Sequence, residues 1–305
     1  MANRSNHNQE LAQLVDQWTR EKGTFETAIT GLTLYRAETL TKPSSSMMDA
    51  SLCMIAQGKK QVILSEETYT YDSNHFLFTA IDLPVIAQVL EASVEQPYLS
   101  IVLRLDPYLL AQIMLEAHIP FKDVNTEKKG MAVGVVNSEL NDAFIRLIKL
   151  LDTPQDIPIL SPLIIKEIFY RLLMSPQGDR LKRIVAAGTT GHRIVKAIEW
   201  LKTNFAKPFS IEELASTMGM SASSFHQHFR DITSMSPLQY QKRMRLTEAR
   251  RLLMTEEYDI SSTSMQVGYE SLSQFSREYK RFFGVSPSVD IKLSFIQIWR
   301  CRPRV

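Results

Sequence analysis

A helical stretch near the end of the chain carries side chains that could read the edges of DNA bases. In residues 221–230 (SASSFHQHFR), Phe225 and Phe229 lie four residues apart, so that one face of a helix would be buried. The rest of the stretch is polar and short. Its polar side chains are Ser223, Ser224, His226 and Gln227. Such donors and acceptors match the hydrogen-bonding groups of base edges in the major groove.

The residues before this stretch predict a second helix and a tight turn that position it. Apolar residues recur at helical spacing through residues 211–218, and Ser210 with Glu213 three positions later has the pattern of a capping box. Gly219 then breaks the helix, because glycine accepts the left-handed conformation of a tight turn. Ser221 is a good N-cap for the next helix. The pattern predicts a helix-turn-helix, whose second helix enters the major groove.

The same pattern occurs twice. Gly219 and Gly268 align with an offset of 49, and after a one-residue insertion Phe225 aligns with Phe275 and Phe229 with Tyr279. Between the copies, residues 238–254 (LQYQKRMRLTEARRLLM) have the composition of a strong helix. A rigid helix would place the two recognition helices about 34 Å apart, in successive segments of the major groove.

Residues 267–287 (VGYESLSQFSREYKRFFGVSP) resemble the signature of the AraC/XylS family of bacterial transcription regulators, and the first copy with its linker helix is similar to the same module. The resemblance implies promoter DNA as a partner, RNA polymerase as a second one if the protein is an activator, and activation as the commoner role. The base-reading positions of the family fall here on Ser223, His226, Gln227, Ser273, Gln274, Ser276 and Arg277.

The chemistry of these side chains agrees with that assignment. Arg277 could hold guanine through O6 and N7, while Gln227 and Gln274 could pair with adenine. The alternatives are a solvated histidine at His226 or at His228, and a phosphate contact or an intrahelical ion pair at Arg277.

Several other basic residues are candidates for phosphate contacts, which would add affinity without sequence information. They are Arg230, Lys242, Arg243, Arg245, Lys280 and Arg281, with Arg250 and Arg251 on the same linker helix. Some of them are expected to be solvated or paired with Glu248. One departure from the family concerns Thr263 and Ser264, which stand where the first copy has an apolar residue and alanine. Two buried hydroxyls would loosen the second unit.

The N-terminal half has the pattern of a β-rich domain. Between residues 31 and 105, short runs rich in β-branched and aromatic residues alternate with Pro, Gly and Asn, which predicts a small barrel or jelly roll. The stretches SLCMIAQGKKQVIL, YTYDSNHFLFTAIDLPV and PYLSIVLRLD also resemble the N-terminal region of one branch of the AraC family. That resemblance implies a cupin-like barrel that senses a small-molecule effector.

Helices are expected before and after the barrel, near residues 10–22, 107–117, 138–151 and 162–174. Their broad apolar faces would pack on each other, on the barrel or on a second subunit. The family resemblance implies a homodimer formed through this half. We expect an α+β chain with a sensor domain at 1–187, an all-α DNA-binding domain with two helix-turn-helix units at 191–290, and a tail at 291–305 that packs on the domain or touches DNA.

Charge and composition fit this division. Residues 191–305 contain 17 Lys and Arg against 11 Asp and Glu, whereas residues 1–190 contain 18 against 22. A basic half suits DNA. Cys53 and Cys301 lack the spacing of a zinc site or a disulfide pattern, and the polar N-terminus has no signal-peptide pattern. The sequence therefore predicts a reduced, cytoplasmic protein without membrane partners.

Enzyme activity is the main alternative, because cupin-like barrels can hold catalytic metals. Such sites need a cluster of histidines with a carboxylate, yet His75 is the lone histidine of the barrel segment. No phosphate loop, nucleophile elbow or dinucleotide motif is present, and Cys53 reads as core. We therefore expect no cofactor and no catalysis. Two other readings stay open: a ligand-independent dimeric regulator with a purely structural barrel, and a cupin-fold enzyme fused to a DNA-binding module.

Overall fold

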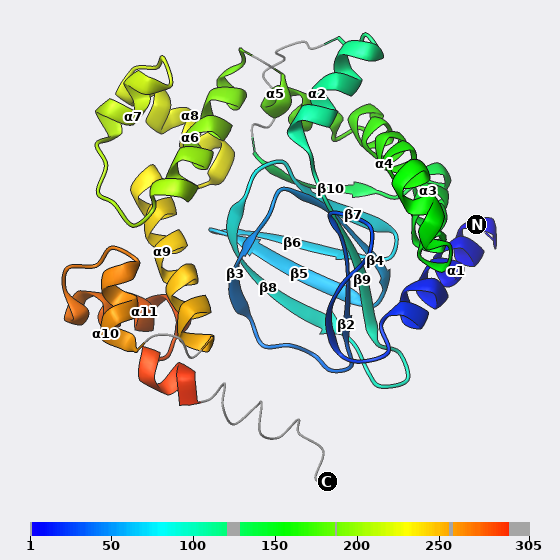
Figure 1. The fold of residues 1–305 in the computed structure, drawn as a ribbon, viewed down its shortest axis with the longest axis horizontal. Helices are drawn as coiled ribbons and strands as arrows, with labels where there is room; N and C mark the ends of the chain where they lie inside the picture. Colours follow the sequence, from blue (N-terminus) through cyan, green and yellow to red (C-terminus); the bar gives the residue numbers. More distant parts are fainter. Residues whose placement is uncertain (1, 121–128, 187, 256–258, 293–305) are drawn as a thin grey trace.

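The structure is a computed structural model that describes residues 2–120, 129–186, 188–255 and 259–292. Within these residues the chain forms a β domain with flanking helices, followed by a helical C-terminal half (Figure 1). The strands are β1 (Gly23–Glu26), β2 (Leu32–Ala37), β3 (Ser44–Met48), β4 (Ser51–Gln57), β5 (Lys59–Leu64), β6 (Glu67–Asp72), β7 (His75–Thr79), β8 (Leu83–Glu91), β9 (Tyr98–Arg104) and β10 (Met131–Val135). This confirms the predicted α+β class with an N-terminal barrel.

The helices surround the β domain and make up the C-terminal half. They are α1 (Ala2–Trp18), α2 (Pro107–Glu116), α3 (Ser138–Lys149), α4 (Ile157–Met174), α5 (Gly178–Val185), α6 (Thr190–Asn204), α7 (Ile211–Thr217), α8 (Ala222–Thr233), α9 (Pro237–Met254), α10 (Ile260–Gln266) and α11 (Leu272–Phe283). Two 3-10 turns, Leu150–Asp152 and Pro154–Asp156, connect α3 to α4. Helix α4 begins five residues before the predicted start and contains Pro162.

Two antiparallel sheets form the barrel. One has the order β1-β2-β9-β4-β7-β10 and the other β3-β8-β5-β6. Strand β4 is buried on both faces: Leu52 and Met54 pack toward the helices, whereas Cys53 and Ile55 face the second sheet. This double burial explains why the sequence of β4 is a continuous apolar run and does not alternate.

The predicted strands correspond to β2 and to β4 through β9, while β1, β3 and β10 were not predicted. Strand β3 has the sequence SSSMM and pairs only with β8 at the edge of its sheet, in the described part of the chain. Three serines give it no hydrophobic alternation, so that its pairing with β8 comes from the tertiary structure.

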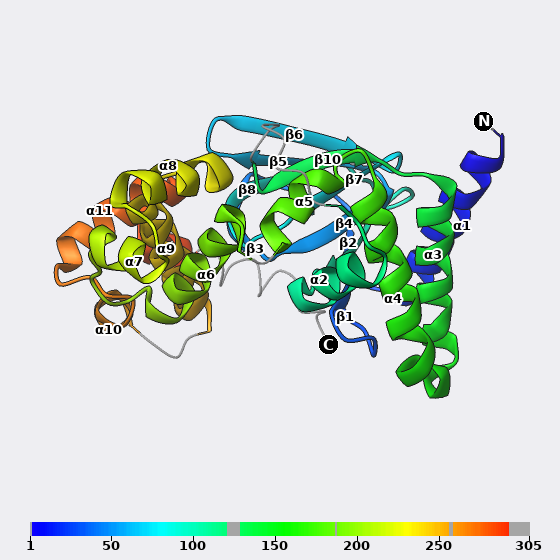
Figure 2. The ribbon, with the colours of Figure 1, turned by 90° about the horizontal axis from the view of Figure 1, so that it is seen from above.

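The helices α1, α3 and α4 cover one side of the barrel, and the C-terminal half lies on the other side (Figures 1 and 2). Three hydrophobic clusters follow this layout. The first joins the outer face of the larger sheet to α1 through α5. The second runs from the barrel interior into α6, α7, α8 and the start of α9, and the third lies among α9, α10 and α11.

Candidate nucleic-acid interface

Two helix-turn-helix units lie at the two ends of α9 (Figure 1). We call α7 with α8 the first unit, and α10 with α11 the second unit. The turns pass through Gly219, with φ of +66°, and Gly268, with φ of +89°. Both turns therefore use the left-handed conformation that favours glycine. The duplication seen in the sequence is a duplication of structure.

Serines cap helices of both units, at the two positions predicted for the first unit and at Ser271 in the second. The hydroxyl of Ser221 accepts the amide N–H of Ser224 at the start of α8, and Ser271 accepts that of Gln274 at the start of α11. Ser210 caps α7 by accepting the amide of Glu213. Each bond satisfies an amide that the helix leaves without a partner, which fixes where the recognition helices begin.

The aromatic pairs are buried as predicted. Phe225 and Phe229 have no exposed surface and their ring centroids are 5.6 Å apart. Phe275 and Tyr279 repeat the arrangement in α11 at 5.5 Å. With one face of each recognition helix anchored in a core, the opposite face is left to solvent.

The predicted base-reading residues lie on these outer faces. Six of them are exposed and Ser276 is half-buried; the exposed ones are Ser223, His226, Gln227, Ser273, Gln274 and Arg277. The predicted residues of α8 and those of α11 form two separate polar surfaces, one on each recognition helix. The two surfaces do not contact each other. Their role at DNA remains a prediction.

Acidic neighbours hold the two glutamines. The amide of Gln227 donates to Asp231 one turn later at 2.8 Å. Gln274 donates to Glu278 at 3.4 Å, and Lys242 pairs with the same carboxylate at 3.0 Å. Burial alone would raise the pKa of Glu278, but the bonds from Lys242 and Tyr269 outweigh it and lower the pKa, so this side chain is charged at neutral pH.

The basic residues predicted to contact phosphates differ in their exposure and in whether other side chains bind them. Arg230, Lys280 and Arg281 are exposed. Lys242 is exposed but paired with Glu278. Arg243 is half-buried, with its guanidinium 5.8 Å from the ring centroid of Phe282, and burial lowers its pKa.

Arg245 has internal partners for its guanidinium. Its Nε donates to the carbonyl of Phe205 at 2.7 Å and its Nη1 to that of Gly268 at 2.9 Å. The Nη2 atom donates to the carbonyls of Ala206 and Lys207 at 3.1 and 3.2 Å. Arg245 thus ties the turn of the second unit to the loop after α6. The sequence offered no signal for this, because the partners are backbone atoms far away in the chain.

The two hydroxyls of Thr263 and Ser264 are buried in the second unit, at 0% and 2% exposure. Neither hydroxyl has a hydrogen-bond partner among the described residues. In the first unit, the corresponding Leu214 and Ala215 are buried hydrophobic residues. The predicted departure from the family pattern is therefore a real difference in the two cores.

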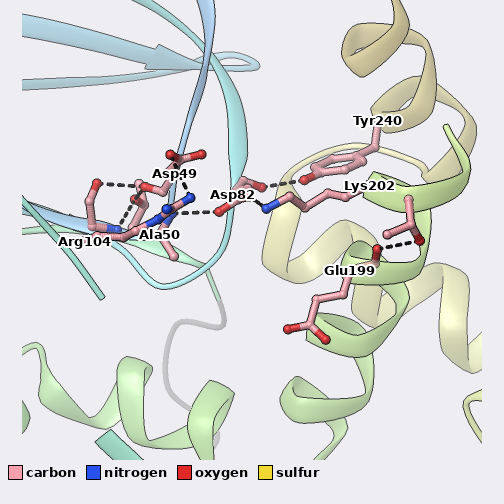
Figure 3. A network of polar contacts seen from close by, with 10 residues as sticks. Asp49, Ala50, Asp82, Arg104, Glu199, Lys202 and Tyr240 are labelled. Atoms are coloured by element: carbon pink, nitrogen blue, oxygen red, sulfur yellow. Dashed lines mark hydrogen bonds and ion pairs between the residues drawn. The ribbon is translucent and has the colours of Figure 1, made fainter. Parts of the chain in front are cut away.

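A polar network joins α6 and α9, the helices on either side of the first unit, to the barrel (Figure 3). Asp82, 8% exposed, lies just before β8; its carboxylate pairs with Lys202 of α6 and accepts the amide of Ala50 at 2.8 Å. Its carbonyl accepts the hydroxyl of Tyr240, on α9, at 2.6 Å. The sequence did not reveal this network, because Asp82 lies 120 positions from Lys202 and 158 positions from Tyr240.

A backbone bond adds to this junction. The amide of Gly130 donates to the carbonyl of Ile232, near the end of α8, at 2.9 Å. A Cβ atom at Gly130 would lie 2.9 Å from Ile81 and 3.2 Å from that carbonyl. The barrel therefore approaches α8 so closely here that a side chain at Gly130 would require its neighbours to shift.

The remaining predictions concern metals, cysteine and the tail. The described residues contain no cluster of three or more metal-ligating side chains, and His75 bonds to Asp72 at 2.7 Å. Cys53 is buried in the barrel, and burial raises the pKa of its thiol, although Lys60 and Ser51 counteract this. Residues 293–305, most of the predicted tail, lie outside the described part of the chain. No helix among the described residues is long and apolar enough to cross a membrane.

Comparisons with protein families give two matches, one in the N-terminal half and one near the C-terminus. Residues 28–180, half of the chain, match the family described as AraC-type transcriptional regulator N-terminus. Residues 214–292 match a helix-turn-helix domain family.

Similar curated proteins are bacterial regulators. The transcriptional activator RhaS of Escherichia fergusonii is 30% identical over 120 residues, which is 39% of this chain and 42% of RhaS. The virulence regulon transcriptional activator VirF of Yersinia enterocolitica is 23% identical over 245 residues, 78% of this chain and 87% of VirF. The chain thus spans less than half the length of RhaS but most of VirF.

Solved structures of ToxT from Vibrio cholerae share the fold. ToxT with a bound unsaturated fatty acid has a TM-score of 0.55 and 14% identity, over 90% of this chain and 97% of ToxT. ToxT with bound (E)-4-(8-methylnaphthalen-1-yl)but-3-enoic acid has a TM-score of 0.57 and 13% identity, over 86% and 98%.

Proposed function

The chain belongs to the AraC-type transcriptional regulators, and from this we propose that it recognises a specific promoter sequence in double-stranded DNA through α8 and α11. The observation that carries the proposal is the exposure of two short polar helix faces, each opposite a buried aromatic pair. One continuous helix, α9, joins the two units. Two recognition helices on a rigid spacer suit two consecutive major-groove segments on one side of a duplex.

In this proposal Arg277 and the two glutamines contact bases, with the serines and His226 beside them. Phosphate contacts come from Arg230, Lys280 and Arg281, which are exposed. Lys242 reaches the DNA backbone only if it breaks its ion pair with Glu278. Arg243 reaches it only if it leaves the ring of Phe282. Arg245 supports the second unit from inside through its carbonyl partners.

Selection of bound duplexes from a random pool tests the proposal. We expect an enriched motif with two half-sites separated by about one helical turn, because each recognition helix reads one half-site. A motif with a single half-site would mean that only one of the two units recognises bases. Absence of any preference at physiological salt would contradict sequence-specific binding.

Arg277→Ala sharpens the assignment of one base contact. Loss of a bidentate contact should lower affinity by roughly 1–3 kcal/mol and relax discrimination at one base pair. Arg281→Ala is the matched control, since a lost phosphate contact weakens all duplexes alike and reduces the salt dependence of binding. The two measurements are binding titrations against the selected site and its single-base variants.

We propose that a small molecule regulates binding through the N-terminal half. Two fold neighbours are solved with an unsaturated fatty acid and with a naphthalenyl butenoic acid, which are acids with apolar bodies. A thermal-shift screen of metabolites tests this, because a ligand that binds the folded state raises the melting temperature. If no compound stabilises the protein, the barrel has a structural role only.

We propose activation as the regulatory outcome, with RNA polymerase as a partner. RhaS and VirF are both described as activators. In vitro transcription from the selected promoter should rise when the protein is added to RNA polymerase. A fall would make the protein a repressor.

We propose a homodimer that forms through α4. Large apolar side chains are exposed along this helix, and four of them recur at helical spacing: Ile159, Leu163, Tyr170 and Met174. Such a stripe can pack against its own copy in a two-fold dimer. Sedimentation should show a dimer that Leu163→Glu converts to a monomer, whereas a monomeric wild-type chain would contradict the proposal.

A further inference from the structure

Each recognition helix contains one glutamine and one carboxylate, and in both helices these two side chains are bonded to each other. In α8 the amide nitrogen of Gln227 donates to Asp231 at 2.8 Å. In α11 the amide nitrogen of Gln274 donates to Glu278 at 3.4 Å. The carboxylate stands four residues after the glutamine in both pairs, so that the partners are neighbours on the helix surface.

The two glutamines are exposed, whereas the two carboxylates are largely covered. The side chain of Asp231 is 19% exposed and that of Glu278 is 12% exposed. Glu278 is also held from two other elements: the hydroxyl of Tyr269, in the turn, donates to it at 2.9 Å, and Nζ of Lys242, on α9, lies 3.0 Å away. With so little exposed surface, the carboxylates are better placed to act on the glutamines than on a base.

A glutamine amide has one carbonyl oxygen and two N–H groups, and a freely rotating amide can therefore pair with either purine. Adenine presents a donor at N6 and an acceptor at N7, which match the amide oxygen and one N–H group. Guanine presents two acceptors, O6 and N7, which match the two N–H groups. A carboxylate that accepts one N–H group removes the second donor that guanine needs. It leaves the oxygen and the other N–H group for adenine.

We propose that Asp231 and Glu278 are positioning residues that set the base preference of the glutamines on α8 and α11. Each carboxylate holds one N–H group of its glutamine, so that Gln227 and Gln274 accept adenine and reject guanine. This inference rests on the proposed recognition of promoter DNA and specifies two of its bases. In the alignment of the two units, Gln274 corresponds to Ser224, three positions before Gln227. The two adenines therefore lie at different places within their half-sites.

Binding titrations of the full chain against its selected duplex test the role of Asp231. Gln227→Ala first identifies the base pair that this glutamine reads, as the pair at which discrimination is lost. At that base pair, Asp231→Ala should lower the preference for adenine over guanine about tenfold, because the freed N–H group lets the guanine duplex bind more tightly. An unchanged preference, or an equal loss of affinity for every duplex, overturns the proposal.

The double variant Gln227→Ala/Asp231→Ala tests whether Asp231 reads a base directly. If Asp231 acts through the glutamine, the double variant has the same base preferences as Gln227→Ala alone, since the two residues work as one unit. A carboxylate could instead accept a hydrogen bond from cytosine N4. In that case the double variant would lose discrimination at a further base pair, and the positioning role would be overturned.

The second unit needs a control for stability, because Glu278 also binds Tyr269 and Lys242. Glu278→Gln keeps the size of the side chain, but its amide can turn and no longer requires an N–H group from Gln274. It should lower the preference for adenine over guanine severalfold at the base pair that Gln274→Ala identifies. Tyr269→Phe removes a neighbouring bond of the carboxylate and should keep the preference. Equal losses in both variants would assign the effect to the fold of the unit and overturn the positioning role there.

Proton exchange of the side-chain amides tests the two bonds without DNA. In NMR spectra of the free chain, the amide protons of Gln227 and Gln274 should exchange with water severalfold more slowly than those of the exposed Gln266 in α10. Asp231→Ala should remove this difference for Gln227 and leave it for Gln274. Equal exchange of all three glutamines in the wild-type chain overturns the proposal. A failure of the proposed DNA binding is told apart from this result, because it appears as a random pool without an enriched motif.

Discussion

The first unit shares a hydrophobic core with the barrel, whereas the second unit has a small core of its own. Both have the same turn, the same caps and the same buried aromatic pair. The first unit also bonds to the barrel through Gly130, and its neighbouring helices α6 and α9 do so through Asp82. The comparison teaches that one copy of a repeated helix-turn-helix can share a core with a neighbouring domain while the other copy keeps a core of its own.

Internal polar bonds support the second unit in place of a shared core. Arg245 donates to the carbonyl of Gly268 in its turn. Arg250 pairs with the buried Asp290, which also accepts a hydrogen bond from the hydroxyl of Tyr279 at 2.8 Å. The guanidinium of Arg250 lies 4.8 Å from the ring centroid of Phe283. These bonds compensate for a core that contains two hydroxyls without partners.

The turn glycines give the largest expected difference. A Cβ atom at Gly268 would lie 2.0 Å from the carbonyl oxygen of Ala206, while at Gly219 the nearest atom is Nη1 of Arg193 at 4.0 Å. Gly268→Ala should destabilise the second unit by roughly 2–5 kcal/mol, from left-handed strain and overpacking. Gly219→Ala should cost the first unit only the strain, about 1–2 kcal/mol. Hydrogen exchange in each unit measures the two losses of stability. Equal losses would show that the loop containing Ala206 moves to make room for the added Cβ atom.

The arginines behind the turns come next. Arg193 donates one exposed bond to the carbonyl of Gly219, whereas Arg245 donates four to carbonyls around Gly268. Arg245→Met should destabilise the second unit by roughly 2–4 kcal/mol, because carbonyls lose a charged donor. Arg193→Met should cost under about 1 kcal/mol.

The salt dependence of DNA binding tests whether Arg245 contacts a phosphate and does not support the second unit from inside. If Arg245→Met kept the second unit stable and lowered the salt slope by about one, Arg245 would be a phosphate contact.

The buried hydroxyls predict a gain in stability. Thr263→Val and Ser264→Ala should each stabilise the second unit by roughly 1–3 kcal/mol, because an apolar group of similar shape removes an unsatisfied polar atom. Ala215→Ser, at the position of the first unit that aligns with Ser264, should destabilise it. Thermal unfolding and hydrogen exchange measure both. Destabilisation by the two apolar replacements would mean that the hydroxyls have partners in solution.

The smallest effect concerns the junction with the barrel. Tyr240→Phe removes the bond to the carbonyl of Asp82 and should cost about 0.5–1.5 kcal/mol, with faster exchange at Gly130. Tyr279→Phe also removes a buried hydroxyl bond, but within the second unit, and should leave Gly130 unchanged. A response of Gly130 to both variants would show that the two units are coupled.

Local signals made the two units predictable from sequence. The signals are glycine at the turns, serine at the helix starts and aromatic residues four apart. Each one determines structure within a few positions, so that it can be recognised from the sequence alone. The strands with apolar runs, such as β4, were predicted for the same reason.

Long-range contacts explain what sequence reasoning could not supply. Asp82 and Lys202 are ordinary surface-type residues in their local sequence, and only the fold brings them together. The carbonyl partners of Arg245 and the edge strand β3 likewise depend on tertiary structure. A cavity of about 400 Å³ between the barrel half and α6 has no sequence signal, because its walls come from five separated segments.

Gly130 has a consequence for hybrid regulators built by exchanging C-terminal halves between relatives. A Cβ atom at this position would lie 2.9 Å from Ile81 and 3.2 Å from the carbonyl of Ile232, so that these neighbours would have to shift. A hybrid with alanine or a larger residue there would have to move Ile81 or the end of α8, even if every fusion point were well chosen. Compatible pairs for such grafts are therefore those in which this one backbone approach is preserved.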